Sequence, residues 1–152
     1  MNYIKKKVFP SVILLRGISI MLLSFRALWS YVYGPAGAFT SGAAFTILFL
    51  ERLTMGICFV IFAMVVWAYY KQDTSLPGKV KLLKPAAYAY CAVYGLMKVY
   101  VMNAIFSEPY LRIIIIMLPT VTEIIGLIGA ILIAEDMLSA FLLIKEEQSL
   151  TV

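Results

Sequence analysis

Four apolar runs, each at least 25 residues long, constrain this chain more than any other feature. They cover residues 8–33, 43–70, 82–106 and 111–144. Crossing the hydrocarbon core of a bilayer takes about 20 helical residues, so each run is long enough to span it. The sequence therefore predicts an all-α fold: an integral membrane four-helix bundle with four transmembrane helices.

The composition agrees with a membrane protein. Hydrophobic residues make up 63% of the 152 positions and charged residues only 14%, with a mean hydropathy of +0.95. Stretches such as CFVIFAMVVW lack the alternation of a transmembrane barrel strand, which favours helices. No repeat and no long linker divides the chain, so we expect a single transmembrane domain over residues 1–152.

Basic residues in the connecting segments predict the orientation. Positive loops stay on the cytoplasmic side of a membrane. Seven lysines occupy the N-terminus and the middle loop, against Arg112 alone in the two opposite loops: Lys5, Lys6, Lys7, Lys71, Lys79, Lys81 and Lys84. Both termini are therefore expected to be cytoplasmic. The basic loops suit anionic lipid headgroups rather than nucleic acid, and the small size and short loops favour a bacterial inner membrane.

Lys84 and Arg112 lie at the ends of their runs and are counted with the loops. Apart from them, eight charged residues fall inside the four runs, four of each sign: Arg16, Arg26, Glu51, Arg52, Lys98, Glu123, Glu135 and Asp136. A charge at the bilayer centre costs roughly 2.5–3.5 kcal/mol, so these groups must pair, face water or lie near the interface. Counting about 1.5 Å per residue predicts two layers. The outer layer holds Arg26, Glu51, Lys98 and Glu123, and in the inner layer Arg16 meets Glu135 and Asp136.

Helical spacing indicates which faces pack. Residues Arg16, Ser19, Leu23, Arg26 and Ser30 follow a 3-4-3-4 spacing, which predicts an inward polar seam on the first helix. In the last helix, small residues recur every four positions at Thr122, Gly126, Ala130 and Ala134. Such a stripe lets another helix approach closely.

The charges inside the four runs fit three interpretations: internal salt bridges, an ion or proton pathway, and contacts to a partner subunit. Arg52 is expected to point outward to the interface or to a neighbouring protomer.

The fourth run is too long for a membrane. Its 34 residues would extend about 51 Å as a helix, so either the helix tilts strongly or its end leaves the bilayer near Ala134. In the second case an apolar segment lies at the cytoplasmic surface and is expected to dock a partner. The residues of this predicted docking segment are Met137, Leu138, Phe141, Leu142 and Ile144.

Residues for familiar chemistry are scarce. The chain has no His, and its two cysteines, Cys58 and Cys91, cannot form a four-thiolate metal site, although they lie at similar depths and a disulfide is conceivable. Tyr90 and Tyr94 stack one turn apart, as in ordinary packing or in a quinone or lipid pocket. We therefore expect no enzyme, no cofactor and no metal.

Two functions fit these observations. The first is a non-enzymatic membrane subunit that anchors or senses at the membrane and assembles with itself or with a cytoplasmic or membrane partner. The second is a small homo-oligomeric ion or proton channel or transporter that uses the charged residues inside its helices. Membrane lipids are expected partners in both cases.

Overall fold

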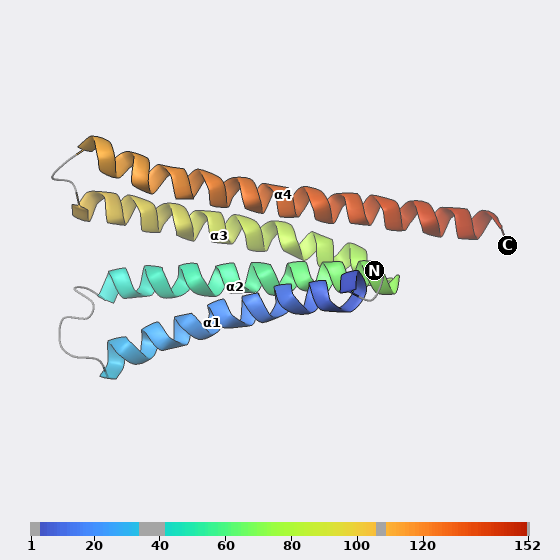
Figure 1. The fold of residues 1–152 in the computed structure, drawn as a ribbon, viewed down its shortest axis with the longest axis horizontal. Helices are drawn as coiled ribbons and strands as arrows, with labels where there is room; N and C mark the ends of the chain where they lie inside the picture. The colour runs from blue at the N-terminus through green and yellow to red at the C-terminus, as the bar shows by residue number, and fades with distance from the viewer. Residues whose placement is uncertain (1–3, 34–41, 106–108, 152) are drawn as a thin grey trace.

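Four long helices run alternately up and down in a computed structural model, which describes residues 4–33, 42–105 and 109–151. The elements, shown in Figure 1, are η1 (Ile4–Val8), α1 (Phe9–Tyr33), α2 (Gly42–Lys71), α3 (Leu76–Ile105) and α4 (Pro109–Leu150). The predicted all-α fold of four packed helices is thereby confirmed.

The helices follow one another in space in nearly the order in which they occur in the chain. Within the described residues, α1 contacts α2 but neither α3 nor α4, whereas α4 contacts both α3 and α2. The α1 and α4 helices therefore lie at opposite edges, and both chain termini lie at the same end (Figure 1). This arrangement leaves α1 with one helical neighbour and α2 with three.

Two apolar clusters hold α2, α3 and α4 together. The larger one lies toward the end that carries the termini, and its buried members are Val65, Ala68, Leu76, Val80, Leu83, Ala134 and Phe141. The smaller one lies farther along the helices, where Cys58 packs with Tyr90 and Tyr94. Both cysteines are free. Removal of these side chains from solvent and lipid is the main source of packing between the three helices.

A pair of glycines brings α1 against α2. A Cβ atom on Gly17 would lie 2.9 Å from Cβ of Phe59 and 3.0 Å from the carbonyl oxygen of Gly56. A Cβ atom on Gly56 would lie 2.3 Å from Cγ of Met21. Only residues without side chains allow this approach, which maximises van der Waals contact between helices in lipid.

This contact selects a different face of α1 from the one that its polar residues predicted. The buried residues are Pro10, Gly17, Ile20 and Ser24. By contrast, Arg16, Ser19, Leu23 and Arg26 are all exposed, so the predicted inward seam was wrong. In the described residues α1 packs on α2 but not on α3 or α4, and its arginines form no ion pair with an acid there. Close backbone approach at Gly17 therefore decides the rotation of α1.

The turn after α2 contains an unusual residue. Gln72 adopts φ 54°, in the left-handed region that favours glycine. Its N–H donates to the carbonyl of Tyr69 over 3.2 Å, and the N–H of Asp73 donates to the carbonyl of Ala68 over 3.0 Å. These two bonds form a Schellman motif, which satisfies carbonyl groups left unpaired at the helix end.

The same turn starts α3 at Leu76, six residues before the predicted boundary. The Ser75 N–H donates to Oδ1 of Asp73 over 2.9 Å and holds the pKa of this carboxyl below its ordinary value. The carbonyl of Ser75 accepts the first helical hydrogen bond, from Lys79. Pro77 then occupies the first turn, where its missing N–H has no cost. Pro85 lies inside the helix.

Three helices are long and apolar enough to cross a membrane by length and composition. The spans are Lys6–Arg26, Phe45–Lys71 and Val121–Leu150. Large apolar side chains on α1 are more than half exposed, including Val12, Leu15 and Leu22. Such a surface is expected to face lipid rather than water. The chain is therefore a multi-pass membrane protein by these three helices.

The C-terminal end of α4 extends past the other helices (Figure 1). The residues from 142 to 151 are all exposed. Phe141, in contrast, is only 4% exposed, and Met137 and Leu138 pack against the larger apolar cluster. These three members of the predicted docking segment therefore belong to the core. The exposed large apolar residues of the end are Leu142, Leu143, Ile144 and Leu150.

Candidate intramembrane polar cluster

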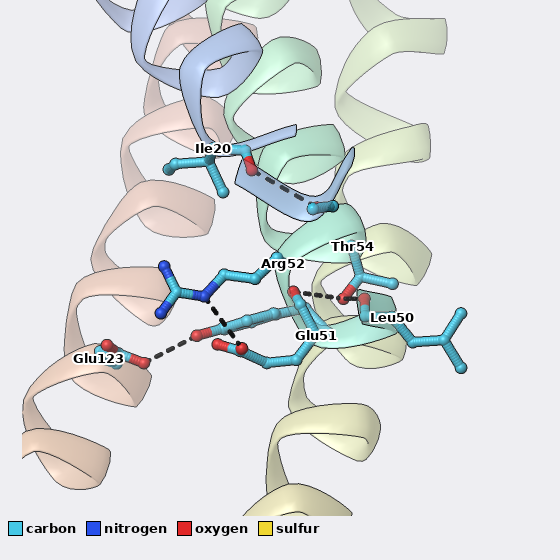
Figure 2. A network of polar contacts seen from close by, with 8 residues as sticks. Ile20, Leu50, Glu51, Arg52, Thr54 and Glu123 are labelled. Carbon is cyan, nitrogen blue, oxygen red and sulfur yellow. Dashed lines mark hydrogen bonds and ion pairs between the residues drawn. The ribbon is translucent and has the colours of Figure 1, made fainter. Parts of the chain in front are cut away.

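Glu51 is the centre of a group of polar residues on α2, α3 and α4. Its side chain is buried, with 6% of the residue exposed. The Nε atom of Arg52 lies 3.4 Å from Oε2 of Glu51. Figure 2 shows these two side chains of α2 extending toward α4, which carries Glu123. Because a buried carboxylate is costly without a counter-ion, the Arg52 guanidinium supports the charged form of Glu51.

Glu123 is joined to α3 by a hydrogen bond. The Tyr90 hydroxyl donates to Oε2 of Glu123 over 2.7 Å, and Figure 2 draws this contact beside the Glu51 and Arg52 pair. Tyr90 is 4% exposed. A hydrogen bond between two helices away from water fixes their relative height and rotation, since sliding either helix would leave both groups unpaired.

Lys98 completes the cluster from the same face of α3. The rings of Tyr90 and Tyr94 are stacked, with centroids 5.4 Å apart and 27° between their planes. The Nζ atom of Lys98 lies 4.8 Å from the centroid of the Tyr94 ring, a cation–π contact. Glu51 interacts electrostatically with Arg52, Glu123 and Lys98. Two acids and two bases therefore balance within one small region, which we call the polar cluster: Glu51, Arg52, Tyr90, Tyr94, Lys98 and Glu123.

Three of the four residues predicted for the outer layer lie in this cluster. Glu51, Lys98 and Glu123 come together, while Arg26 is exposed on α1, which contacts neither α3 nor α4 in the described residues. Arg52, expected to point away, instead bonds Glu51 with its Nε and leaves 44% of its side chain exposed. The Arg112 side chain lies outside the part of the chain that the structure describes.

The predicted inner layer is not formed. Glu135 pairs with Lys84 of α3, whose Nζ atom lies 2.5 Å from Oε1. Arg16 is exposed on α1, across the bundle from α4, and Asp136 is exposed. The expectation that Arg16 meets Glu135 was therefore wrong, because depth alone does not say which helices are neighbours. The sequence analysis placed Lys84 in the middle loop and did not consider it as a partner for an acid on α4. Its position near the end of the bundle was the signal that could have identified it.

The stripe of small residues on α4 is buried at one end and exposed at the other. Ala134 is buried in the larger apolar cluster, which agrees with close packing. Thr122 and Gly126 are exposed, and a Cβ atom on Gly126 would have nothing within 4 Å. Close approach through glycine occurs instead between α1 and α2, at Gly17 and Gly56. The sequence analysis did not predict this contact.

A cavity of about 310 Å³ lies next to the polar cluster, between α2, α3 and α4. Its apolar wall includes Met55, Phe59 and Phe62 of α2 and Leu83 of α3. The α4 side is formed by Glu123, Gly126, Leu127 and Ala130, and Tyr90 is the other polar residue in the wall. Apolar cavities with few polar groups are the usual form of small-molecule sites.

The arrangement has two chemical capacities. It joins α3 to α4 through the hydrogen bond between Tyr90 and Glu123, and it places a carboxylate with a hydroxyl partner beside an apolar cavity. Function must be argued from this site, because a helical bundle by itself hosts many activities. No family model, no curated protein and no solved structure matches the chain.

Proposed function

We propose that this protein is a non-enzymatic, multi-pass membrane subunit with four spans and cytoplasmic termini, which binds a partner protein through the exposed end of α4. The observation that carries the proposal is the segment Leu142–Leu150. It is helical, it is exposed throughout, and it extends beyond the helices that support the rest of α4.

The topology supports a fourth span in α3. The α2 and α4 helices each hold a candidate span. The α3 helix has 30 residues, lies beside both of them and connects the end of α2 to the opposite end of the bundle (Figure 1). At 1.5 Å per residue it is about 45 Å long, enough to cross. With neighbours on two sides, α3 needs less lipid-facing apolar surface than α1.

The orientation follows from the basic residues at the end of the bundle that carries the termini. Lys6 and Lys7 precede α1, and Lys71, Lys79 and Lys81 flank the turn between α2 and α3. All five are at one end, as the positive-inside rule requires of a cytoplasmic face. The end of α4 that we propose for partner binding lies on this same face.

Isolated helical ends seldom remain folded without support. Short helices are marginal in water, and most helical stability comes from packing of an apolar face. Leu142 and Leu143 are 50% and 62% exposed, and Leu150 is 81% exposed. A partner that covers these side chains would stabilise the last turns of α4. The charged residues Lys145, Glu146 and Glu147 between them would form the polar rim of such an interface.

The test compares the full chain with a chain that ends at Phe141, which keeps the buried side chains of α4. Both are purified in mild detergent, and the mass of each intact complex is measured. We expect a larger complex, with a second protein or further copies, for the full chain only. The matched control replaces Ile125, Leu132 and Ile133 with Ala, since these exposed residues of α4 precede the segment Leu142–Leu150, and it should leave the complex intact. A single chain in every sample would remove the proposal.

A second candidate function is ion or proton transport, which the charged residues gathered in the polar cluster favour. Four helices seldom enclose a path by themselves, so several copies would assemble around one. Purified protein in liposomes should then conduct protons or alkali cations, and Glu123→Gln and Lys98→Met should each reduce the flux. Arg26→Gln is the control, because Arg26 lies outside the cluster. Flux that neither cluster variant changes would rule this function out.

A further inference from the structure

We propose that the cavity between α2, α3 and α4 binds a small, compact hydrophobic amine whose ammonium group bonds to Glu123. This inference is independent of partner binding at the end of α4. It depends on three observations: the cavity is held open, its polar groups accept hydrogen bonds, and its single acid lacks an ion-pair partner in the described part of the chain.

The cavity is held open from two sides. Toward the termini, Ala134 and Phe141 of α4 pack into the larger apolar cluster. On the other side, the hydrogen bond from Tyr90 to Glu123 ties α4 to α3. Between these two attachments α4 presents Gly126 and Ala130, whose small side chains do not fill the space. The space of about 310 Å³ between these attachments opens toward the exposed Gly126, so a ligand can enter it.

The polar wall of the cavity selects donors of hydrogen bonds. The Tyr90 hydroxyl gives its hydrogen to Oε2 of Glu123, so its oxygen has only lone pairs left to offer. An ionised Glu123 carboxylate likewise only accepts. Phosphates, carboxylates and quinone carbonyls bring further acceptors and are disfavoured. A phospholipid headgroup is disfavoured for the same reason, because its phosphate would accompany any ammonium group.

The charges of the polar cluster favour a cation at this position. Glu51 forms its ion pair with Arg52, and Lys98 lies over the ring of Tyr94. Within the described residues, no Lys or Arg forms an ion pair with Glu123. A ligand ammonium would give Glu123 a direct ion-pair partner in a region of low dielectric, where a charge-assisted bond is strong.

The size of the cavity sets the size of the ligand. Small-molecule sites commonly measure about 300–1,000 Å³, so a cavity of about 310 Å³ takes a compact molecule rather than a long chain. Three probes of the same cage shape separate charge from size: 1-adamantylammonium, 1-adamantanol and adamantane-1-carboxylate. The first carries donors and a positive charge, the second is neutral, and the third brings only acceptors.

The experiment measures binding of each probe to the full chain in phosphatidylcholine nanodiscs, with empty nanodiscs to subtract partition into lipid. We expect 1-adamantylammonium to bind roughly tenfold to a hundredfold more tightly than 1-adamantanol, as a charge-assisted hydrogen bond predicts. Adamantane-1-carboxylate should not bind. Equal binding of all three probes, or no binding above empty nanodiscs, overturns the proposal.

Variants locate the site. Glu123→Gln keeps the shape of the side chain and should abolish the advantage of the amine over the alcohol. Gly126→Leu fills the cavity and should remove binding of both. Gly129→Leu is the matched control, because a Cβ atom on Gly129 also has nothing within 4 Å but this residue does not line the cavity. Ala130→Leu repeats the filling test if Gly126→Leu does not fold. Unchanged amine binding after filling contradicts the proposal.

Discussion

Gly17 and Gly56 face each other across α1 and α2 so closely that a Cβ atom added to either would lie 3.0 Å from the carbonyl oxygen of the other. This contact is the main attachment of α1, which touches no other long helix in the described residues. The rotation of α1, and therefore the outward direction of Arg16 and Arg26, follows from it. A change at either glycine acts on the whole α1–α2 interface.

Replacing Gly56 with Ala should destabilise the protein. The new methyl group would overlap Met21 and crowd backbone atoms of α1, and overpacking of this kind typically costs about 1–3 kcal/mol. The better helix propensity of Ala returns only about 1 kcal/mol. Unfolding in a detergent titration measures the net effect. Gly95→Ala is the control, because its added Cβ meets nothing within 4 Å and its stability should rise. Equal stability of the two variants would contradict the close contact.

Tyr90→Phe should weaken the junction between α3 and α4. It removes the hydroxyl that donates to Glu123 and leaves the stacking on Tyr94 in place. Hydrogen bonds between membrane helices contribute about 0.6 kcal/mol on average and up to about 1.7 kcal/mol, so we expect a loss near 1 kcal/mol. Tyr88→Phe provides the comparison, since Tyr88 is 68% exposed and its variant should match the unaltered protein. A loss of similar size at Tyr88 would argue against the assigned role of Tyr90.

Phe141→Ala and Leu142→Ala should separate folding from partner binding at adjacent positions. Phe141 is buried between α2, α3 and α4, and truncation of a buried Phe costs about 3–5 kcal/mol. Leu142 is half exposed, so its truncation should change the free energy of unfolding by less than about 1 kcal/mol. Thermal unfolding and the mass of the complex are measured for both. Strong destabilisation by Leu142→Ala would show that the end of α4 is supported within the chain itself.

Gln72→Gly should stabilise the turn between α2 and α3. Gln72 has φ 54°, which costs a residue with a side chain roughly 1–2 kcal/mol and glycine almost nothing. The substitution also removes the bond from Nε2 of Gln72 to the carbonyl of Tyr69, so we expect a net gain of about 0.5–1 kcal/mol. Gln72→Ala loses that bond without relieving the backbone and should not stabilise. Stability is read from the unfolding midpoint of each variant.

The sequence by itself determined the parts that depend on one helix at a time. Length and apolar content predicted four helices, and the bounds of α1 and α2 agree with the prediction to within one residue. A run of 25 or more apolar residues can form few structures other than a helix in a membrane. The same reasoning identified Glu51, Lys98 and Glu123 as charges that need partners. It missed the start of α3 because the Asp73 and Ser75 cap and Pro77 lie in a polar stretch that resembled a loop.

Only the tertiary structure decided which helices are neighbours and which face each one turns inward. Two glycines set the rotation of α1. The position of α1 across the bundle from α4 left Arg16 without Glu135, whose partner is Lys84. Burial of Phe141 and exposure of Leu142 likewise depend on where α3 begins beside α4. These outcomes come from packing between segments distant in the chain. The helical periodicity of one segment does not predict which other segment packs against it.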